Sequence, residues 1–417
     1  MKPTTLNDSL LSRRAFLFVG GFVPVSALLA GCGGGSGSAQ SSRTSRAFGT
    51  YTVTPVTPTT GTFEAVDISE TGVVAGLHTL SPANGRAFPQ EAVLYENGTF
   101  RTVAPVNANT EGVSALNNRG GVVGMSVSPT NYLDRTPLVY VDGQLISGSD
   151  PRFSDGVSRI GQTIGINDRG DLLVATSTDL SPPNARPSDE VFRFGASVLQ
   201  VGSVGKASFT PVAIMPPANT NLYPVGINAS GTVVGNKQNA SGLLEERAVV
   251  WKDGTITMLP TLAPGQMTQA TCIGDDGTVG GQATSAQAHD SYEADTAVLW
   301  PANGGNPTVL PGPSERILKV TDVNANGVAI GVALTYAQAH PRSVTPSNTP
   351  SQELAQESVP LIWKNGEYRD INELLKPNSG WYIRGLSRIT NSGLILAYGS
   401  PQDNRSANSI ACILTPQ

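Results

Sequence analysis

Short alternations of hydrophobic and polar residues, each ended by a glycine-containing turn, recur from about residue 49 to the end of the chain. The stretch VGINASGTVVG, Val225 to Gly235, shows the pattern clearly. Its hydrophobic positions flank a small polar segment with Asn at the first turn position and Gly at the fourth. These two residues favour a type I turn, because Gly readily takes a positive φ angle. The stretch is therefore predicted to form a β-hairpin.

Seven versions of this hairpin occur, with 46 to 66 residues between successive turn glycines. These glycines are Gly72, Gly120, Gly170, Gly231, Gly277, Gly327 and Gly393. A second hairpin follows six of the seven, usually with Asn-Gly or Asp-Gly at its turn, which is a strong hairpin signal. One aromatic residue ends the first strand of each second hairpin, which indicates a repeated packing layer. These aromatic residues are Tyr95, Tyr140, Phe194, Trp251, Trp300 and Trp363.

Four strands in each repeat predict the blade of a β-propeller. We expect an all-β fold over residues 49–417, a seven-bladed β-propeller of four-stranded blades. The last repeat ends on Ser409 to Pro416, a third strand with no fourth after it. Tyr51 to Val56 precedes the first repeat and matches the end of its outer strand, so it is predicted to join the last blade and close the ring. An open solenoid of seven stacked units is the alternative.

The repeat resembles the HAF-type extracellular repeat of bacterial exported proteins, in which xxINxxGxVVG is followed by AFLWxxG. At the second motif this chain has Ala-Val-Leu-Trp, and no repeat has a His-Ala-Phe triplet. The segment from Asp370 to Gly399 also looks like the closing segment of such proteins. The resemblance implies export and a repeat fold, and it carries no agreed activity.

Residues 1–31 are predicted to be a signal peptide rather than part of the fold. The run SRRAFL, with Arg13 and Arg14, resembles the twin-arginine export motif. A chance arginine pair in a general secretory signal would look the same, so the route stays open. The apolar stretch after it, Phe16 to Leu29, is short and rich in glycine for a membrane span.

The sequence Leu-Ala-Gly-Cys at residues 29–32 resembles a bacterial lipoprotein box, which implies that Cys32 becomes the lipidated first residue. Gly33 follows instead of Asp, so the resemblance implies the outer rather than the inner membrane. Residues 32–48 are rich in Gly and Ser and are predicted to be a flexible tether. We therefore expect the folded body to lie outside the cytoplasm, attached to the membrane through its lipid anchor only.

Composition narrows the range of functions. Charged residues make up 14% of the chain, against a usual value of about 25%, and the formal net charge is −5. A mildly acidic chain without a basic run is not expected to bind nucleic acid. The only histidines are His78, His289 and His340, in no spacing typical of metal ligands. We expect no metal, no cofactor and a monomer.

The segments between the second and third strands vary most in length, and in a propeller they lie on one face with the links between blades. Loops of variable length on a rigid scaffold commonly carry binding sites. His289 and Asp290 lie in one such loop and are candidate ligand-binding residues, with solvated loop positions as the alternative. Trp381 and Tyr382, in the link into the last repeat, are a candidate aromatic platform, with packing against the ring as the alternative.

Three charged residues share one position on the innermost predicted strand, two places before the turn residue. They are Asp67, Asp322 and Arg388, in the first, sixth and seventh repeats, and the other repeats have small residues there. Ring closure would make these repeats neighbours, so Arg388 is predicted to lie between the two carboxylates. The cluster is interpreted as an ion pair network at the closure, or as a binding spot at the channel mouth.

No catalytic residues are predicted. We expect a binding or scaffolding protein for a cell-envelope glycan or protein, using the face with the variable loops. The alternative is a hydrolase or lyase acting on an extracellular polymer. It would need acidic residues from several loops to converge, such as Asp155, Asp179, Glu190, Asp290 and Glu293.

Overall fold

The computed structural model describes most of the chain after residue 47. The described residues are 48–80, 90–105, 110–127, 135–146, 159–179, 192–200, 211–214, 220–239, 246–284, 295–335, 358–405 and 407–417. They belong to one compact unit, Arg46–Gln417. Among them, no helix has the length and hydrophobicity needed to cross a bilayer.

These residues form seven antiparallel sheets of four strands each, numbered here by the chain order of their innermost strands. Sheets 1 to 3 contain β2 (Thr62–Ile68), β3 (Val74–Thr79), β4 (Gln90–Glu96) and β5 (Thr99–Ala104); β6 (Thr110–Leu116), β7 (Val122–Val127), β8 (Arg135–Val141) and β9 (Gln144–Ile146); and β10 (Arg159–Ile166), β11 (Asp171–Asp179), β12 (Phe192–Gln200) and β13 (Pro211–Ile214).

Sheets 4 to 6 have the same order. They contain β14 (Thr220–Ile227), β15 (Val233–Asn239), β16 (Arg247–Lys252) and β17 (Thr255–Met258); β18 (Thr268–Ile273), β19 (Val279–Ala283), β20 (Thr296–Trp300) and β21 (Thr308–Val309); and β22 (Ile317–Val323), β23 (Ala329–Leu334), β24 (Val359–Lys364) and β25 (Glu367–Asp370).

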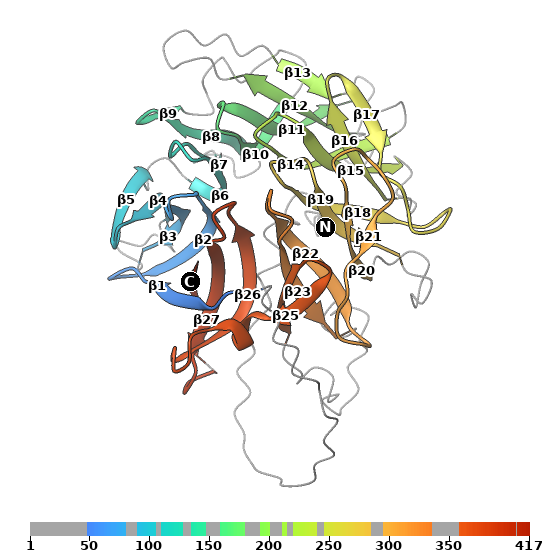
Figure 1. Ribbon diagram of the computed structural model, residues 1–417. Coiled ribbons are helices and arrows are strands. Elements are labelled where there is room, and N and C mark those ends of the chain that lie inside the picture. Colours follow the sequence, from blue (N-terminus) through green and yellow to red (C-terminus); the bar gives the residue numbers. More distant parts are fainter. Residues whose placement is uncertain are drawn as a thin grey trace, which may run out of the picture. The chain divides into compact units, whose positions relative to one another are not determined.

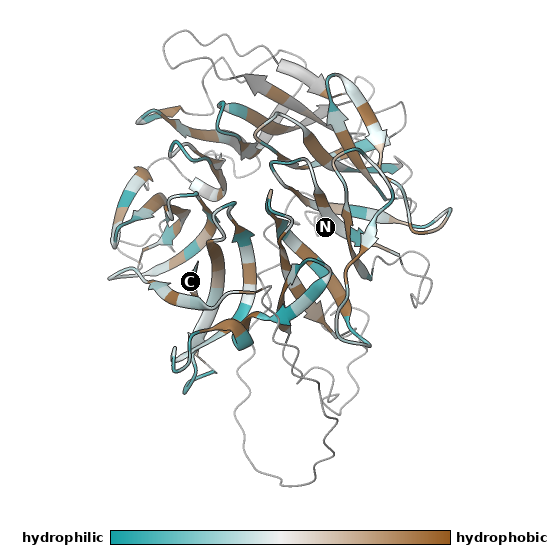
Figure 2. Ribbon diagram, in the orientation of Figure 1, coloured by the Kyte–Doolittle hydropathy of each residue, from teal (hydrophilic) through white to brown (hydrophobic). Residues whose placement is uncertain are grey.

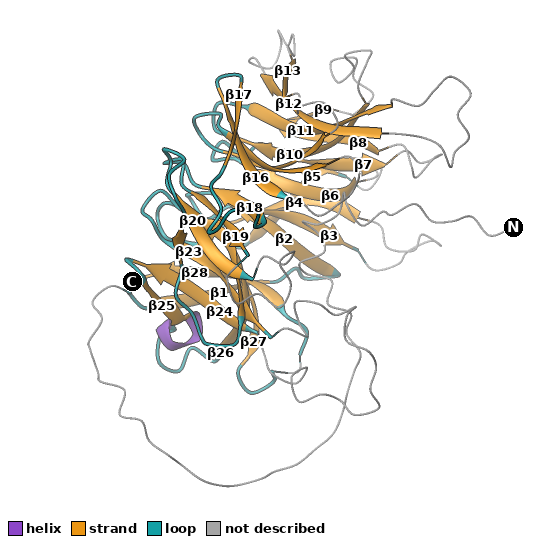
Figure 3. Ribbon diagram, turned by 90° about the vertical axis from the view of Figure 1, so that its right-hand side faces the viewer, coloured by secondary structure: helices purple, strands orange, loops and turns teal. Residues whose placement is uncertain are grey.

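Sheet 7 combines the two ends of the unit. Its strands are β26 (Trp381–Ile389), β27 (Ile395–Pro401), β28 (Ile410–Pro416) and β1 (Tyr51–Val56), in that order. In Figure 1 the blue strand β1 lies beside the red strands of the C-terminal sheet. A short 3-10 helix, η4 (Ile371–Leu374), purple in Figure 3, follows β25 and leads toward β26.

The arrangement is that of an all-β β-propeller with four-stranded blades, which confirms the predicted fold class at this level. The innermost strands β2, β6, β10, β14, β18, β22 and β26 surround a common axis (Figure 1). In Figure 2 the brown, hydrophobic segments run along the strands, whereas many hairpin tips are teal. This is the expected distribution when both faces of every sheet are covered by neighbouring sheets.

The turns form as the sequence predicts. All seven turn glycines have positive φ angles, between 71° at Gly327 and 90° at Gly277. In the second hairpins, Asn97-Gly98 and Asn365-Gly366 have two consecutive positive φ angles, as a type I′ turn requires. Two residues of the repeated aromatic position form part of the packing between sheets. Trp300 and Trp363 are fully buried, and each indole N–H donates to a proline carbonyl.

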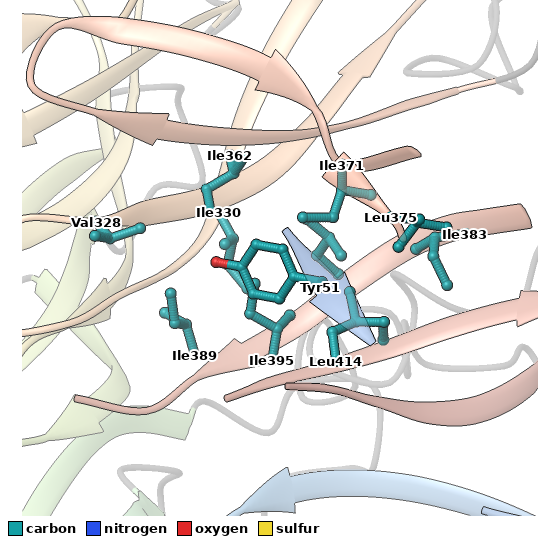
Figure 4. Packing of buried hydrophobic residues seen from close by; sticks show 12 residues of the cluster. Tyr51, Val328, Ile330, Ile362, Ile371, Leu375, Ile383, Ile389, Ile395 and Leu414 are labelled. Atoms are coloured by element: carbon teal, nitrogen blue, oxygen red, sulfur yellow. The ribbon is translucent and has the colours of Figure 1, made fainter. Parts of the chain in front are cut away.

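Hydrophobic clusters join each sheet to the next one in the chain, and two of them contain β1. Tyr51 lies among Ile330, Ile371, Leu375 and Ile395, residues of sheets 6 and 7 and of the segment that connects them (Figure 4). Val56, at the other end of β1, packs in a cluster that combines sheet 7 with sheet 1, through Leu396, Ile413, Ala65 and Val74. Strand β1 therefore contributes to two inter-sheet cores.

Candidate functional site

A β-bulge interrupts every innermost strand at the same repeat position. The pairing register shifts between Ala65 and Asp67 in β2, between Val320 and Asp322 in β22, and between Leu386 and Arg388 in β26. The other four innermost strands shift at the equivalent residues. Bulges redirect side chains. The three charged residues singled out in the sequence each come directly after the bulge.

Asp67 and Asp322 make matching contacts in sheets 1 and 6. Asp67 accepts hydrogen bonds from the backbone N–H of Ile68 and, in the next sheet, of Leu116, each at 2.9 Å. Asp322 accepts from the N–H of Ile389 in the next sheet, also at 2.9 Å, and from the N–H of Val323. Each carboxylate thus links two neighbouring sheets through backbone donors.

Arg388 lies near both carboxylates. Its Nε is 3.4 Å from Asp67 Oδ1, and the two side chains are only 21% and 15% exposed. Burial alone lowers the pKa of Arg388, but the charges of Asp67 and Asp322 raise it above its ordinary value. For Asp322, burial raises the pKa to about 6, although Arg388 and the backbone donors act in the opposite direction. The cluster therefore holds a stably charged guanidinium beside a carboxylate that is costly to ionise.

A polar cavity of about 160 Å³ lies on the axis, next to this cluster and at the face formed by the inner hairpin turns. Every innermost strand contributes to it, through the residue just before the turn. These are Ile68, Leu116, Ile166, Ile227, Ile273, Val323 and Ile389. The residues after the turn Asn or its equivalent form the rim, including Glu70, Asn118, Asp168, Asp275 and Asn391.

The rim residues link successive turns by hydrogen bonds. Asn118 accepts from the N–H of Glu70, Asp168 from Asn118, Asp275 from Ala229, Asn391 from Ala325, and Glu70 from Asn391, at distances of 2.6 to 3.0 Å. Each bond runs from one sheet to its neighbour, and the last runs from sheet 7 to sheet 1. We call the seven equivalent positions after the turn residue the turn belt. Five of them carry these acceptors, and the other two, Ala229 and Ala325, have no side-chain acceptor.

The repeated Asn of the turn has two tasks. In Asn167, which is buried, Oδ1 accepts from the N–H of Arg169 and Asp171 and so stabilises its own turn. Its Nδ2 donates to the carbonyl of Asn228, the same residue of the next sheet. Asn117, Asn228 and Asn324 donate to the next sheet in the same way.

Sequence reasoning assigned this Asn to the turn alone and missed both the inter-sheet bond and the turn belt. A signal was present, because five of the seven residues after the Asn position carry an acidic or amide side chain. Its meaning depends on the lateral spacing of the sheets, which a single sequence does not give.

The aromatic pair in β26 is divided between core and surface. Trp381 is partly buried and packs against the cluster around Tyr51. The guanidinium carbon of Arg405 lies 4.1 Å from the ring centroid of Tyr382, so one face of that ring is covered by a cation–π contact. The two rings are therefore not a single open platform.

Several predicted positions cannot be compared with the structure. Cys32, Arg13, Arg14, His289 and Asp290 lie outside the described residues. His78 is described and is buried in sheet 1. Its ring nitrogens lie 3.1 Å from Glu91 Oε1 and 2.7 Å from the carbonyl oxygen of Thr60. Within the described part of the chain, no three His, Cys, Asp or Glu residues are grouped closely enough to hold a metal ion.

Comparison with known proteins supports the fold only. No family model and no curated protein matches this chain. Among solved structures, the β-propeller domain of the Trilobed protease from Pyrococcus furiosus, described as having an open velcro topology, has a TM-score of 0.52 at 10% identity. The match covers 85% of this chain and 95% of that one.

Two further structures fall below a TM-score of 0.5. A prolyl endopeptidase reaches 0.49 at 12% identity, where the match covers 88% of this chain and 47% of the other, about half of its length. YCF48 from Cyanidioschyzon merolae reaches 0.46 at 10% identity, with 87% and 99% of the two chains covered. At such identities the likeness concerns the propeller architecture alone.

Proposed function

We propose that this chain is an exported, lipid-anchored binding or scaffolding protein of the bacterial cell envelope. The motif around Arg13 and Arg14, the lipoprotein box ending at Cys32 and the resemblance to HAF-type repeats support export and anchoring. The ligand is a cell-envelope glycan or protein, and it is bound by the variable loops of the propeller.

We also propose that the seven sheets form one seven-bladed ring, which the N-terminal strand closes. Support comes from β1, which pairs with β28 along its whole length, Tyr51 with Pro416 through Val56 with Ala411. The turn belt supports it as well, since Glu70 of sheet 1 accepts from two backbone N–H groups of sheet 7, those of Asn391 and Ser392.

The observation that favours binding over catalysis is how the axial carboxylates are used. Asp67, Glu70, Asp168, Asp275 and Asp322 each accept at least two hydrogen bonds from protein donors. All five join neighbouring or nearby sheets. A carboxylate that fixes the backbone of a ring is poorly placed to exchange protons with a substrate, so the axis serves as a rigid frame that carries the loops.

The anchoring is tested by replacing Cys32. The Cys32→Ala variant is expected to lose incorporation of labelled palmitate and to move from the membrane to the soluble fraction, whereas Cys412→Ala, which alters a buried cysteine, keeps both. An Arg13→Lys/Arg14→Lys variant is expected to stay in the cytoplasm if the twin-arginine route is used. Unchanged lipid labelling of Cys32→Ala would rule out the anchor.

The binding function is tested with the full chain, purified in detergent. We expect it to retain cell-envelope glycans on an array or a defined envelope protein in a pull-down, without altering them. Shortening of an extracellular polymer, measured by product size, would instead establish the hydrolase or lyase. In that case Asp155→Asn and Glu190→Gln, two of the acidic loop residues named above, should reduce product formation.

A further inference from the structure

The axial cavity presents hydrogen-bond donors on one side that the protein itself does not use. In β10, β14 and β18, the N–H of the turn Asn or Gly points toward the paired strand, as shown by the bonds from Asn167 to Asp171, Asn228 to Thr232 and Gly274 to Thr278. Successive N–H groups of a strand point to opposite sides. The preceding N–H groups, those of Ile166, Ile227 and Ile273, therefore point away from the sheet and toward the axis.

Sheets 1, 2, 6 and 7 have the same N–H groups, but Asp67 and Asp322 accept their hydrogen bonds. In sheets 3, 4 and 5 the residues equivalent to Asp67 are Gly165, Gly226 and Cys272, none of which has a side-chain oxygen. In the described part of the chain, no side chain takes the N–H of Ile166, Ile227 or Ile273, and all three residues line the cavity. Three adjacent sheets thus supply three donors to one small space.

The same cavity has acceptors with spare capacity. Glu70, Asp168, Asp275 and Asp322 line it, and each accepts two hydrogen bonds from the protein. An ionised carboxylate offers about four lone-pair sites, so about two remain on each. Free donors and free acceptors therefore line the same cavity.

We propose that the axial cavity binds a small neutral molecule with several adjacent hydroxyl groups, such as a polyol or one end of a sugar ring. A hydroxyl both accepts and donates, so it can accept from the backbone N–H groups of Ile166 and Ile227 while donating to a carboxylate such as Asp275. A simple anion would be repelled by the four carboxylates, and a simple cation would leave the N–H groups unused. The site lies at the inner hairpin turns, whereas the variable segments connect the opposite ends of the second and third strands, so it does not rest on the function proposed above.

The size of the cavity limits the ligand. Its volume of about 160 Å³ is what about five molecules of liquid water occupy. One ring-sized group can enter the cavity, whereas a second sugar unit must lie outside. The ligand is a free polyol or monosaccharide, or the terminal unit of a glycan that enters end on.

The decisive variant is Gly165→Asp, which copies Asp67 into sheet 3. The new carboxylate would take the N–H groups of Ile166 and Ile227, as Asp67 takes those of Ile68 and Leu116. Gly165 does not have a positive φ angle, and an added Cβ would lie 3.2 Å from Ile227 Cγ2, so a small shift accommodates it. The matched control is Gly112→Asp in β6, which adds the same charge where a Cβ meets nothing within 4 Å.

Ligand-observed NMR and calorimetry on the full chain in detergent test the proposal, with glycerol, myo-inositol, glucose and methyl glucoside as probes and acetate and spermidine as charged competitors. We expect at least one hydroxylated probe to bind with millimolar affinity, Gly165→Asp to weaken it roughly tenfold or more, and Gly112→Asp to leave it unchanged. An oligosaccharide ending in the same sugar distinguishes a terminal glycan unit from a free ligand.

Binding of spermidine or acetate alone, equal binding by Gly165→Asp, or no binding by any hydroxylated probe would each overturn the proposal. If Gly165→Asp does not fold, Asp275→Asn provides the second variant. Its amide oxygen still accepts from Ala229, and loss of one acceptor charge should weaken the same probe several-fold.

Discussion

At the scale of single residues, the repeated Asn of the inner turn determines more than the turn. Its Oδ1 satisfies two backbone N–H groups of its own hairpin, and its Nδ2 bonds to the neighbouring sheet. No other amino acid has an acceptor and a donor at this same distance from the backbone, one for its own turn and one for the next sheet. Asp would lack the donor, and Gln would place both groups one methylene further away.

Replacement of Asn167 by Ala is expected to lower the free energy of unfolding by about 2–3 kcal/mol. The variant leaves the N–H groups of Arg169 and buried Asp171 without their side-chain acceptor and removes the bond to the carbonyl of Asn228 in the next sheet, which keeps only its bond from Gly231. Denaturant titration measures the loss. Asn303→Ala is the control, because exposed Asn303 accepts from Gly305 within its own turn, and it should cost less than about 1 kcal/mol. Equal losses in the two variants would refute the inter-sheet role.

The raised pKa of Asp322 predicts a specific pH dependence. Its value of about 6, against 3.8 for a free side chain, means that the folded state binds more protons at this site than the unfolded state between about pH 4 and 6. The contribution of Asp322 to stability is therefore full below pH 4 and falls as the pH rises toward 6 and above.

Thermal unfolding of the protein and of Asp322→Asn between pH 3.5 and 7 measures this contribution. Because other carboxylates change equally in both, the difference in stability isolates residue 322. We expect the wild type to lose stability relative to the variant as the pH rises from 4 to 6. A difference that stays constant or changes in the opposite direction would contradict the prediction.

At the scale of elements, the hairpins could be predicted from the sequence because their causes are local. Gly at the fourth position of the inner turn and Asn-Gly in the second hairpin act within four residues, and both hairpins form as predicted. The bulge before Asp67, Asp322 and Arg388 has no comparable local signal, since it arises from the twist and pairing of two strands. The same applies to the turn belt, which depends on the distance between neighbouring sheets.

The two alanine positions of the turn belt provide a test at this scale. We expect Ala229→Asn to raise the free energy of unfolding by about 0.5–1 kcal/mol, because its side chain would accept from the N–H of Asp168 as Asp275 accepts from that of Ala229. The matched variant is Ala325→Asn. There Asn391 already reaches over to Asp275, with Nδ2 2.9 Å from Oδ2, so the added side chain competes with it and should gain less.

Chemical denaturation of the wild type and of both variants gives the three free energies of unfolding to be compared. If Ala229→Asn is less stable than the wild type, or if Ala325→Asn gains more than Ala229→Asn, the turn belt does not add stability position by position.

At the scale of the whole molecule, sheet 7 contains a strand, β1, that is far in sequence from its partners. Strand β1 could be assigned to the last sheet from sequence because Ser409 to Pro416 had no following strand. Its burial could not be foreseen. Val56 is 1% exposed and packs between sheets 7 and 1, whereas Thr54 of the same strand is exposed.

Val56→Asp is therefore expected to destabilise the entire unit by about 4 kcal/mol or more, since it places a carboxylate without a partner in an inter-sheet core. Thr54→Asp adds the same charge to the same strand in water and should change the stability by less than about 0.5 kcal/mol. If β1 closes a ring, Val56→Asp should lower the midpoint of one cooperative transition that includes the tryptophans of sheets 5 and 6, Trp300 and Trp363. Both signals are followed during heating. Tryptophan fluorescence reports the unfolding around the tryptophans, and far-ultraviolet circular dichroism reports the loss of β-structure. A variant in which Trp300 and Trp363 unfold at the wild-type temperature would show that β1 is a local addition to sheet 7 and does not close a ring.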